Sequence, residues 1–514
     1  MRHLVVCCDG TWNTREQQTT RVPTPTNVVR LYNALDDVDG DGHEQVRYYH
    51  PGVGTDGSWI DRLVAGGLGV GLSHNIMSAY HWLAVHYRPG DRISVFGFSR
   101  GAYTVRSLAG MIATCGLLDL ADADPAEAWR RVDRAYDVGY RPPTDRRAGR
   151  GWAGRWPFHH GPEGAPVAVH LVGVWDTVGA LGIPDTVGLI AVLNRDLRHR
   201  FHDTTLSRSI RCGRHAVAMD ETRGPFTPTL WTDPQPGQDV AQVWFPGDHS
   251  DVGGGHPQSG LSDGALRWMI EEAGKSAGLA FRPTAVDQIA PDYLDVLHDS
   301  CTGIYRQLSP QPRAVPVVAR DRSPGVMHSS AFDRQDNPPI TASRYWPTRV
   351  LRPGESATVD VFARQEWNAT GLYLEPGGYA FTATGQWLDG RMPADAAGHS
   401  DSRLHPEELA HMAGSALGVA ERLAQRIPGN ELGEFPATRR AEDLPWMSLV
   451  GVVANWTIQP EPDEPPRHDR FGIGTDTRFT VLKPGYLYAF ANDAWGLYGN
   501  NRGSVALTVT RAGS

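Results

Sequence analysis

The sequence predicts a mixed α/β domain with a mostly parallel sheet flanked by helices, followed by an all-β sandwich domain. Three observations lead to this prediction. Short apolar runs of strand length alternate with segments of helical periodicity between residues 4 and 245. After residue 345, short β-type runs follow one another between Gly and Pro turns. Finally, 514 residues exceed what one hydrophobic core usually supports, so we expect at least two domains.

The first domain is expected to span residues 1–340. Its strands are continuous apolar runs, as in a parallel sheet that is buried on both faces. The helix expected over 66–87 begins with glycine. Between residues 119 and 164 the pattern loosens into acidic turns and an aromatic loop, where we expect a lid or an insertion. The expected strands are 4–8, 45–50, 93–98, 167–174 and 240–245, with helices over 66–87 and from residue 100 onward.

Composition excludes several classes of function. A net charge of −9 argues against a general nucleic-acid binder. The five cysteines have neither metal-ligand spacing nor the pattern of a disulfide framework. We expect no transmembrane segment, because the apolar stretches are too short to cross a bilayer. With no signal-peptide pattern, we expect a chain made in the cytoplasm, and export by a signal-independent route stays open.

The central motif is Gly-Phe-Ser-Arg-Gly at residues 97–101, a Gly-x-Ser-x-Gly sequence. It lies between an expected buried strand and an expected helix, which is the context of a nucleophile elbow. A side chain at either flanking position would collide with the neighbouring strand or helix. Ser99 would then sit at a helix N-terminus, where the backbone N–H of Arg100 faces a developing oxyanion. The alternative is a strand-to-helix turn that merely contains a serine.

The turn after the first strand, Asp9-Gly10-Thr11, is placed to supply a second oxyanion donor from the N–H of Gly10 or Thr11. The triplet also resembles the haloacid dehalogenase phosphatases. Cys7 occupies the position of their nucleophilic aspartate, so we reject that interpretation. Under either hypothesis the turn is tight, with Asp9 and Asn13 as capping residues.

Asp176 and His249 each follow an expected strand, so the order along the chain is Ser99, Asp176, His249. This is the order of the α/β-hydrolase triad. A serine becomes a nucleophile when a base removes its proton, an imidazole titrates near neutrality, and a carboxylate fixes the imidazole tautomer. We therefore predict a Ser-Asp-His triad.

Three other residues compete for these roles. His215 is a rival base, but it lies in a mixed segment rather than at a strand end. Asp248 and Asp251 are rival carboxylates, which we expect to shape the loop that contains His249. The glycines at 253–255 would let this loop pass close to another element.

Four segments, at residues 4–13, 96–112, 173–179 and 243–255, together resemble the catalytic domain of the type VI secretion phospholipase effectors, formerly a domain of unknown function. The resemblance implies an α/β-hydrolase serine esterase that cleaves phospholipid esters and needs no cofactor for catalysis. It carries the triad roles over to Ser99, Asp176 and His249. An immunity or secretion partner stays undetermined.

The leading hypothesis is therefore a phospholipase or lipase with a surface-binding module. Two alternatives remain. One is an esterase for a soluble or carbohydrate-linked ester, and the other is a catalytically silent binding protein on a hydrolase scaffold.

The second domain is expected over residues 345–514, after a proline-rich connection. We expect an insertion near 391–444 that includes a helix at 406–426. The expected strands are 356–362, 378–383, 471–482, 487–490 and 504–510.

One loop of this domain, residues 491–504, contains the oxygen-bearing side chains of Asp493, Asn500 and Asn501. Such hard donors suit calcium, although Asn and Asp also abound in ordinary turns. With residues 385–389, the loop resembles the soluble calcium-dependent galactose-binding lectins of bacteria.

This resemblance covers roughly residues 350–514 and implies a Ca²⁺ site and a carbohydrate ligand. The implied calcium ligands are the side chains of Asp493, Asn500 and Asn501 and the carbonyls of Leu497 and Asp389. Residues 405–407, His-Pro-Glu, are the candidate remnant of the sugar-contacting segment.

Overall fold

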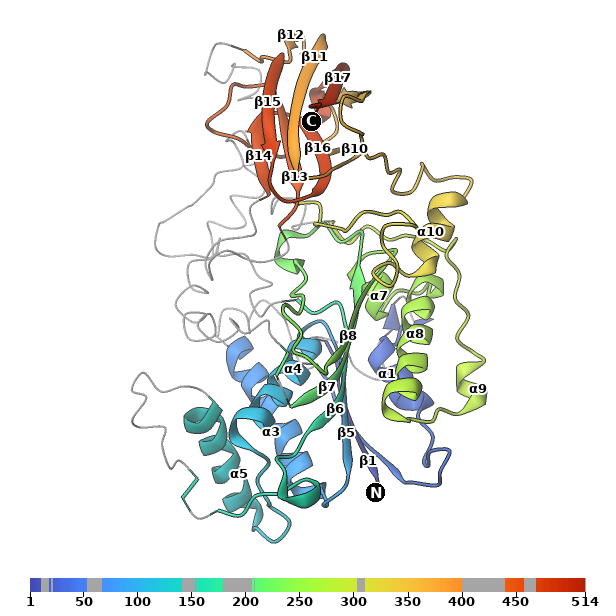
Figure 1. Ribbon diagram of the computed structural model, residues 1–514, viewed down its shortest axis with the longest axis vertical. Helices are drawn as coiled ribbons and strands as arrows, with labels where there is room; N and C mark the ends of the chain where they lie inside the picture. The colour runs from blue at the N-terminus through green and yellow to red at the C-terminus, as the bar shows by residue number, and fades with distance from the viewer. Residues whose placement is uncertain are drawn as a thin grey trace. The chain divides into compact units, whose positions relative to one another are not determined.

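The described residues of this computed structural model form two compact units (Figure 1). One comprises Met1–Ser300 and Pro324–Ser343, and the other comprises Cys301–Ser323 and Arg344–Ser514. Residues 301–323 therefore group with the second unit. The structure describes all residues except 11–17, 20–21, 53–66, 141–152, 155, 179–205, 208, 303–309, 400–439, 457–467 and 514.

A parallel sheet of six strands organises the first unit. Every pairing between neighbours is parallel, and the strand order is β4-β1-β5-β6-β7-β8. The mostly parallel sheet expected from the sequence is thus confirmed. The strands are β1 (His3–Cys8), β4 (Gln45–His50), β5 (Arg92–Phe98), β6 (Val169–Trp175), β7 (Ile210–Ala218) and β8 (Asp239–Phe245).

Helices cover both faces of this sheet (Figure 1). Because strand side chains alternate, Leu4 and Val6 of β1 join one buried cluster while Val5 and Cys7 join the other. Helices α3 (Gly67–His86), α4 (Arg100–Cys115) and α5 (Pro125–Arg134) contribute to the first cluster. Helices α1 (Asn27–Ala34) and α8 (Gly260–Ala277) contribute to the second.

The remaining elements of this unit are short. They are β2 (Gln18–Thr19), β3 (Val22–Pro23), a π-helix (Ala135–Tyr140), α7 (His249–Gly253), α9 (Pro283–Val286), α10 (Ser329–Asp336) and single 3₁₀ turns at Pro162–Gly164 and Gly224–Phe226. In the part of the chain that the structure describes, no helix combines the length and the apolar character needed to cross a membrane.

Strand β7 is the main difference from the sequence-based prediction, which treated residues 215–221 as a mixed segment. The strand contains a buried arginine, Arg214, whose guanidinium bonds to Glu272 at 2.6 Å and to Asp239 at 2.5 Å. These partners come from α8 and from the start of β8. Since tertiary contacts neutralise the charge, the strand is buried despite an interrupted apolar run.

The described part of the region at 119–164 contains α5 and the π-helix. The rings of Trp156 and Phe158 pack against the cluster beneath α4, and the Arg131 guanidinium carbon lies 5.5 Å from the centroid of the Trp156 ring. These two aromatic residues therefore pack on their own domain. Trp152 lies outside the described residues, and a lid remains a prediction.

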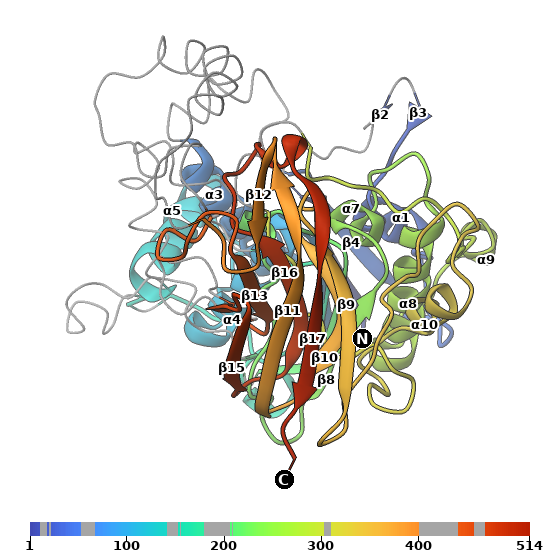
Figure 2. The same ribbon diagram turned by 90° about the horizontal axis from the view of Figure 1, so that it is seen from above.

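The second unit contains two antiparallel sheets around a shared core (Figure 2). One sheet has the order β10-β16-β13-β14, and the other has the order β12-β11-β17-β9, with β15 also paired to β11. The strands are β9 (Ser356–Phe362), β10 (Asn368–Leu374), β11 (Gly377–Asp389), β12 (Met392–Asp395), β13 (Leu449–Ala454), β14 (Asp469–Gly472), β15 (Asp476–Val481), β16 (Gly485–Ala491) and β17 (Arg502–Arg511).

The structure refines this part of the prediction. The single strand expected at 471–482 is divided into β14 and β15, with Gly474 between them at a φ of 58°. Strand β12 lies at the start of the expected insertion and pairs with the end of β11. The expected helix at 406–426 lies outside the described residues.

Candidate active site

Ser99 lies on a sharp turn between β5 and α4. Its φ of 56° and ψ of −122° are unusual for a residue with a side chain, and its hydroxyl does not cap the helix that follows. A Cβ atom at Gly97 would lie 2.4 Å from the carbonyl oxygen of Gly101, and one at Gly101 would lie 2.1 Å from the carbonyl oxygen of Cys8. Both flanks thus require glycine, because the turn packs against the first helical residues and the end of β1.

Asp176 and His249 are in direct contact. The Nδ1–H of His249 donates to Oδ2 of Asp176 at 2.6 Å, while the N–H of Ala218 donates to Oδ1 of Asp176 at 3.0 Å. Asp176 is fully buried and has a positive φ of 36°. A carboxylate bound to Nδ1 fixes the tautomer of the imidazole and leaves Nε2 with its lone pair.

The strand registers bring Ser99 to the same edge of the sheet. Phe98 pairs with Trp175, so Ser99 and Asp176 follow adjacent strand ends, and the N–H of Ser99 donates to the carbonyl of Trp175 at 3.1 Å. The ring of Phe98 lies 4.6 Å from the His249 ring between centroids. Ser99 and the Asp176–His249 pair therefore lie close together, although they are up to 150 residues apart in sequence.

The loop around His249 is shaped by close backbone approaches. His249 is the first residue of α7, whose N-cap Asp248 accepts from the N–H of Asp251 while Asp251 accepts from the N–H of Asp248. A Cβ at Gly253 would lie 1.9 Å from the Phe98 ring, and one at Gly254 would lie 2.7 Å from the nitrogen of Asn27. The consecutive glycines therefore let the loop pack on the elbow strand and on the start of α1.

Phe226 completes the surroundings of the imidazole, and no pattern in the sequence indicated it. Its ring lies 5.0 Å from the His249 ring, at an interplanar angle of 80°. The guanidinium of Arg223 covers Phe226 at 3.6 Å and pairs with the buried Glu221. These contacts hold His249 between two aromatic rings.

The candidate oxyanion donors lie at the ends of two adjacent elements. Arg100 is the first residue of α4, and Gly10 follows β1, the strand next to β5. The N–H of Gly10 donates to the side chain of Asp9 at 2.8 Å. Thr11 and Asn13 lie outside the described residues.

Asp9 connects three elements at this end of the sheet. Its Oδ2 accepts from the hydroxyl of Thr26, which caps α1, at 2.8 Å, and from the hydroxyl of Tyr49 in β4 at 2.9 Å. The sequence indicated a capping role for Asp9, but these two partners lie too far along the chain to be predicted from it.

The rival base His215 has a different position. It is fully buried within β7, its Nε2 accepts from the N–H of Thr177 at 3.1 Å, and its Nδ1 lies 3.4 Å from Oε1 of Gln242. The imidazole thus holds the turn that contains Asp176. His215 is a positioning residue for this turn.

A second polar cluster lies in the antiparallel unit, where the lectin resemblance implies calcium ligands. The amide of Asn500 donates to Oδ1 of Asp389 at 2.9 Å, and the amide of Asn501 donates to Oδ2 of Asp493 at 2.7 Å. Within the part of the chain that the structure describes, the Oδ1 atoms of Asn500 and Asn501 are buried without a hydrogen-bond partner. The carbonyl of Leu497 accepts from the N–H of Asn500 at 3.3 Å.

Burial raises the pKa of Asp493 to about 7, and the nearby carboxylate of Asp389 adds to this shift. The side chain of Asp389 thus joins the cluster, whereas the resemblance implied only its backbone carbonyl. Two carboxylates and two unpartnered amide oxygens form a donor set that suits a hard cation.

Comparison with known proteins assigns the first unit to a family. The family model described as the type VI secretion system (T6SS) phospholipase effector Tle1-like catalytic domain matches residues 2–272, more than half of the chain. The chain belongs to this Tle1-like family.

An uncharacterized protein of Saccharomyces cerevisiae is 34% identical over 250 residues, which are 45% of this chain and 33% of that protein. The chain therefore spans about a third of the length of this curated relative.

The chain also has distant likenesses among solved structures. An uncharacterized protein from Pseudomonas aeruginosa has 18% identity, with a TM-score of 0.33 over 60% of this chain and 50% of that one. The EclA N-terminal domain, a PllA-like lectin, has 19% identity and a TM-score of 0.18 over 30% of this chain and 94% of that one. The Tle1 effector bound to the VgrG spike has 18% identity and a TM-score of 0.29 over 50% and 51% of the two chains.

The geometry of the elbow generates a stability prediction. Replacing Gly101 by alanine (G101A) forces the Cβ against the Cys8 carbonyl and should destabilise the first unit by about 1–3 kcal/mol. The matched control is G264A in α8, where a Cβ meets nothing within 4 Å. Because alanine favours a helix more than glycine does, G264A should raise the free energy of unfolding by about 1 kcal/mol. Urea denaturation followed by circular dichroism measures both changes. A G101A protein that unfolds at the wild-type midpoint would contradict this account of the turn.

Proposed function

We propose that the chain is a serine-dependent carboxylic ester hydrolase of the α/β-hydrolase type, and that its substrate is a phospholipid. The observation that carries this proposal is the 2.6 Å bond between His249 and Asp176 next to the strained Ser99. Membership of a family described as phospholipase effectors supports the substrate class.

In the proposed reaction, Nε2 of His249 removes the hydroxyl proton of Ser99 as Oγ attacks the ester carbonyl carbon. The N–H of Arg100 stabilises the oxyanion of the tetrahedral intermediate. The intermediate collapses when His249 returns the proton to the leaving alcohol, which leaves an acyl-Ser99 ester. Water then attacks the acyl group with His249 again as the base, and the carboxylic acid leaves.

Asp176 stabilises the imidazolium that forms in both steps. Its carboxylate is fully buried, and the Ala218 N–H fixes one oxygen so that the other faces His249. The positive charge on His249 therefore develops next to a negative charge in a low-dielectric environment. The rings of Phe98 and Phe226 restrict rotation of the imidazole away from this partner.

The family description also supports a proposal about delivery. We propose that the chain leaves the cell by the type VI route, which would make a component of that secretion apparatus its protein partner. A soluble or carbohydrate-linked ester and a silent binding role remain the alternatives to phospholipid hydrolysis.

The first test is release of fatty acid from mixed phospholipid vesicles by the wild type and by S99A. We expect release by the wild type and a loss of at least about 10³-fold in S99A, because no other group supplies the nucleophile. The control variant is S107A, which removes a buried hydroxyl two turns along the same helix. It should keep wild-type activity.

A serine-reactive fluorophosphonate probe separates the alternatives. Labelling of the wild type without vesicle hydrolysis would favour a soluble ester, and labelling should disappear in S99A. No labelling of a folded wild type would leave the silent binding role and contradict the proposed mechanism.

We further propose that the antiparallel unit binds Ca²⁺ and, through it, a carbohydrate. The residues fit this ion, because Asp389 and Asp493 supply charge and the buried Oδ1 atoms of Asn500 and Asn501 otherwise lack a partner. A bound calcium ion would neutralise the two carboxylates and offer free coordination positions to sugar hydroxyls. The candidate sugar-contacting residues 405–407 lie outside the described residues.

Calcium should raise the melting temperature of the full chain, because it binds the folded state only. At a calcium concentration a hundredfold above the dissociation constant, the free energy of unfolding should rise by about 2.7 kcal/mol. The D493N variant should lose this shift. The control is D443N, which changes an exposed carboxylate whose side chain is 67% accessible. An equal calcium shift in D493N and wild type would rule out this loop as the site.

The same carboxylate makes the stability of the calcium-free chain depend on pH. With a folded-state pKa of about 7 against an ordinary value of 3.8, Asp493 keeps a proton that the unfolded chain releases. Its contribution to stability therefore rises as the pH falls from about 7 toward 3.8, and calcium affinity falls over the same range. The difference in melting temperature between wild type and D493N, measured without calcium across this range, should follow that direction. A difference that does not change with pH would contradict it.

A further inference from the structure

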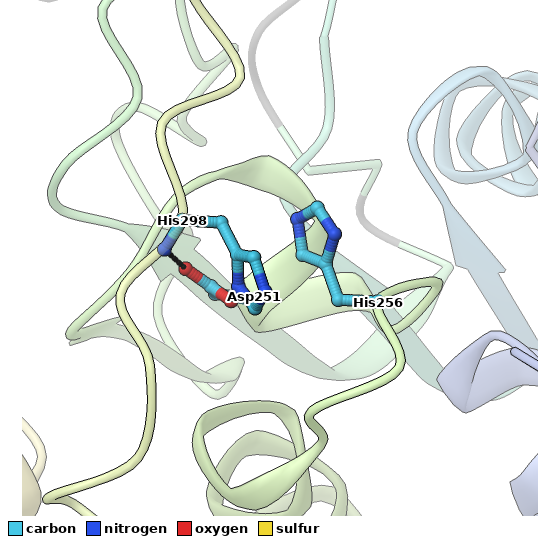
Figure 3. Close-up of side chains that lie close together, drawn as sticks. All are labelled: Asp251, His256 and His298. Atoms are coloured by element: carbon cyan, nitrogen blue, oxygen red, sulfur yellow. Dashed lines mark hydrogen bonds and ion pairs between the residues drawn. The ribbon is translucent and has the colours of Figure 1, made fainter. Parts of the chain in front are cut away.

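Two imidazoles and the carboxylate of Asp251 meet beside α7, at a place that the proposed catalytic mechanism does not use (Figure 3). Asp251, His256 and His298 each offer a ligand atom within 4.8 Å of the others. Asp248 joins them through its contact with His256. His298 arrives from a loop 47 residues after Asp251, so the tertiary fold assembles the group.

Each carboxylate accepts from two backbone N–H groups and also contacts an imidazole. Oδ1 of Asp248 accepts from the N–H groups of Ser250 and Asp251, and Oδ2 lies 3.3 Å from Nε2 of His256. Oδ2 of Asp251 accepts from the N–H groups of Asp248 and His298, and Oδ1 lies 2.6 Å from Nδ1 of His298. Backbone bonds therefore fix both carboxylates, which are 0% and 1% exposed.

The imidazoles are held just as firmly. The rings of His256 and His298 stack with centroids 3.8 Å apart and an angle of 14° between their planes, as Figure 3 shows. Nε2 of His298 lies 3.2 Å from the side-chain oxygen of Gln258. Such a bond from the second ring nitrogen is the usual way in which proteins orient a metal-binding histidine.

This arrangement gives His298 one nitrogen that faces a carboxylate oxygen and one that faces an amide oxygen. A neutral imidazole has a single N–H, and both of these oxygens accept, so one of the two contacts lacks a proton unless the ring is protonated or a cation lies beside it. The two buried carboxylates also repel each other and need a counter-charge. A divalent cation at the centre of the four side chains satisfies both requirements with one charged group.

We propose that Asp248, Asp251, His256 and His298 form a binding site for a divalent transition-metal ion of the zinc class. Two nitrogen ligands favour such an ion over calcium or magnesium, which prefer oxygen ligands throughout. Nε2 of His256 lies 3.2 and 3.3 Å from the two oxygens of Asp248, while Nδ1 of His298 lies 2.6 Å from Oδ1 of Asp251, a pair that the ion would move apart. Ligands about 2.0–2.1 Å from a tetrahedral zinc ion lie about 3.3 Å from one another.

Three of these residues offer ligand atoms within 4.8 Å of one another, and Asp248 contacts His256; with all four bound, no position would stay open, and the site would be structural. The ion would tie α7 to the loop that contains His298. Because His249 begins α7, the ion would also stabilise the position of the catalytic imidazole without contact with substrate. This role goes beyond the proposed hydrolase function and does not depend on it.

The test uses the full chain, freed of metal with a chelator and then kept in excess Ca²⁺ to occupy the oxygen-rich loop. Titration with Zn²⁺ against a chromogenic chelator should reveal one tight equivalent. H256Q and H298Q should each weaken this binding by more than about a hundredfold, and Q258A, which removes only the orienting oxygen, by about 10–100-fold. The control is H43Q, which alters a separate cluster of Asp39, Asp41 and His43 and should bind as the wild type does.

Substitution with Co²⁺ provides a second measurement, because a tetrahedral cobalt site absorbs strongly in the visible range. The wild type, H43Q and Q258A should show this band, and H256Q and H298Q should lack it. Melting curves without metal identify any variant that fails to fold. If H256Q or H298Q fails to fold, Q258A still tests the site, because it retains every ligand. The proposal is overturned if the folded wild type binds no equivalent of Zn²⁺, if H256Q and H298Q both bind it unchanged, or if H43Q loses it.

Discussion

Across the parallel sheet, Cys8 pairs with Gly97, Phe98 with Trp175, and Ala218 with Phe245. Since all six strands run in the same direction, these registers make the chain leave the sheet at one edge after each strand. The elbow, the Asp176 turn and the His249 loop therefore meet there. A shift of one residue in any of these registers would also exchange the side chains between the two buried clusters, so the packing of the core fixes the geometry of the site.

Backbone strain at this edge occurs at two of the three positions of the proposed triad. Ser99 and Asp176 both have positive φ values, of 56° and 36°, without being glycine. Each such residue costs about 1–3 kcal/mol and persists only where its surroundings hold it. The N–H of Ser99 bonds to the carbonyl of Trp175, and the N–H of Asp176 bonds to the carbonyl of Ala216, so each turn is anchored to the next strand of the sheet. The sheet thereby supports two strained turns at adjacent positions.

The sequence predicted those parts of the fold that depend on local patterns. The strand at 45–50 and the strand expected at 93–98 agree with β4 and β5 to within one residue, because each is a short run bounded by turn residues. β7 was missed because Arg214 breaks the apolar run, and its partners Glu272 and Asp239 are remote in sequence. Ser99, Asp176 and His249 follow strand ends, which are local patterns, so the sequence indicated them. Phe226 and His298 reach their positions through loops, and no local pattern indicated them.

Three buried carboxylates show how the surroundings decide what an acidic side chain can do. Asp176 has a histidine on one oxygen and a backbone N–H on the other, an arrangement that would stabilise the imidazolium of the proposed mechanism. Asp251 has a histidine and two backbone N–H groups, next to a second carboxylate and a second imidazole, which is the donor set of the transition-metal site that we propose. At Asp493 the repulsion from Asp389 exceeds the attraction from Arg440, and the ligands nearby are amides. Burial without a sufficient counter-charge raises the pKa of this carboxyl, and a hard cation is the partner that would relieve it.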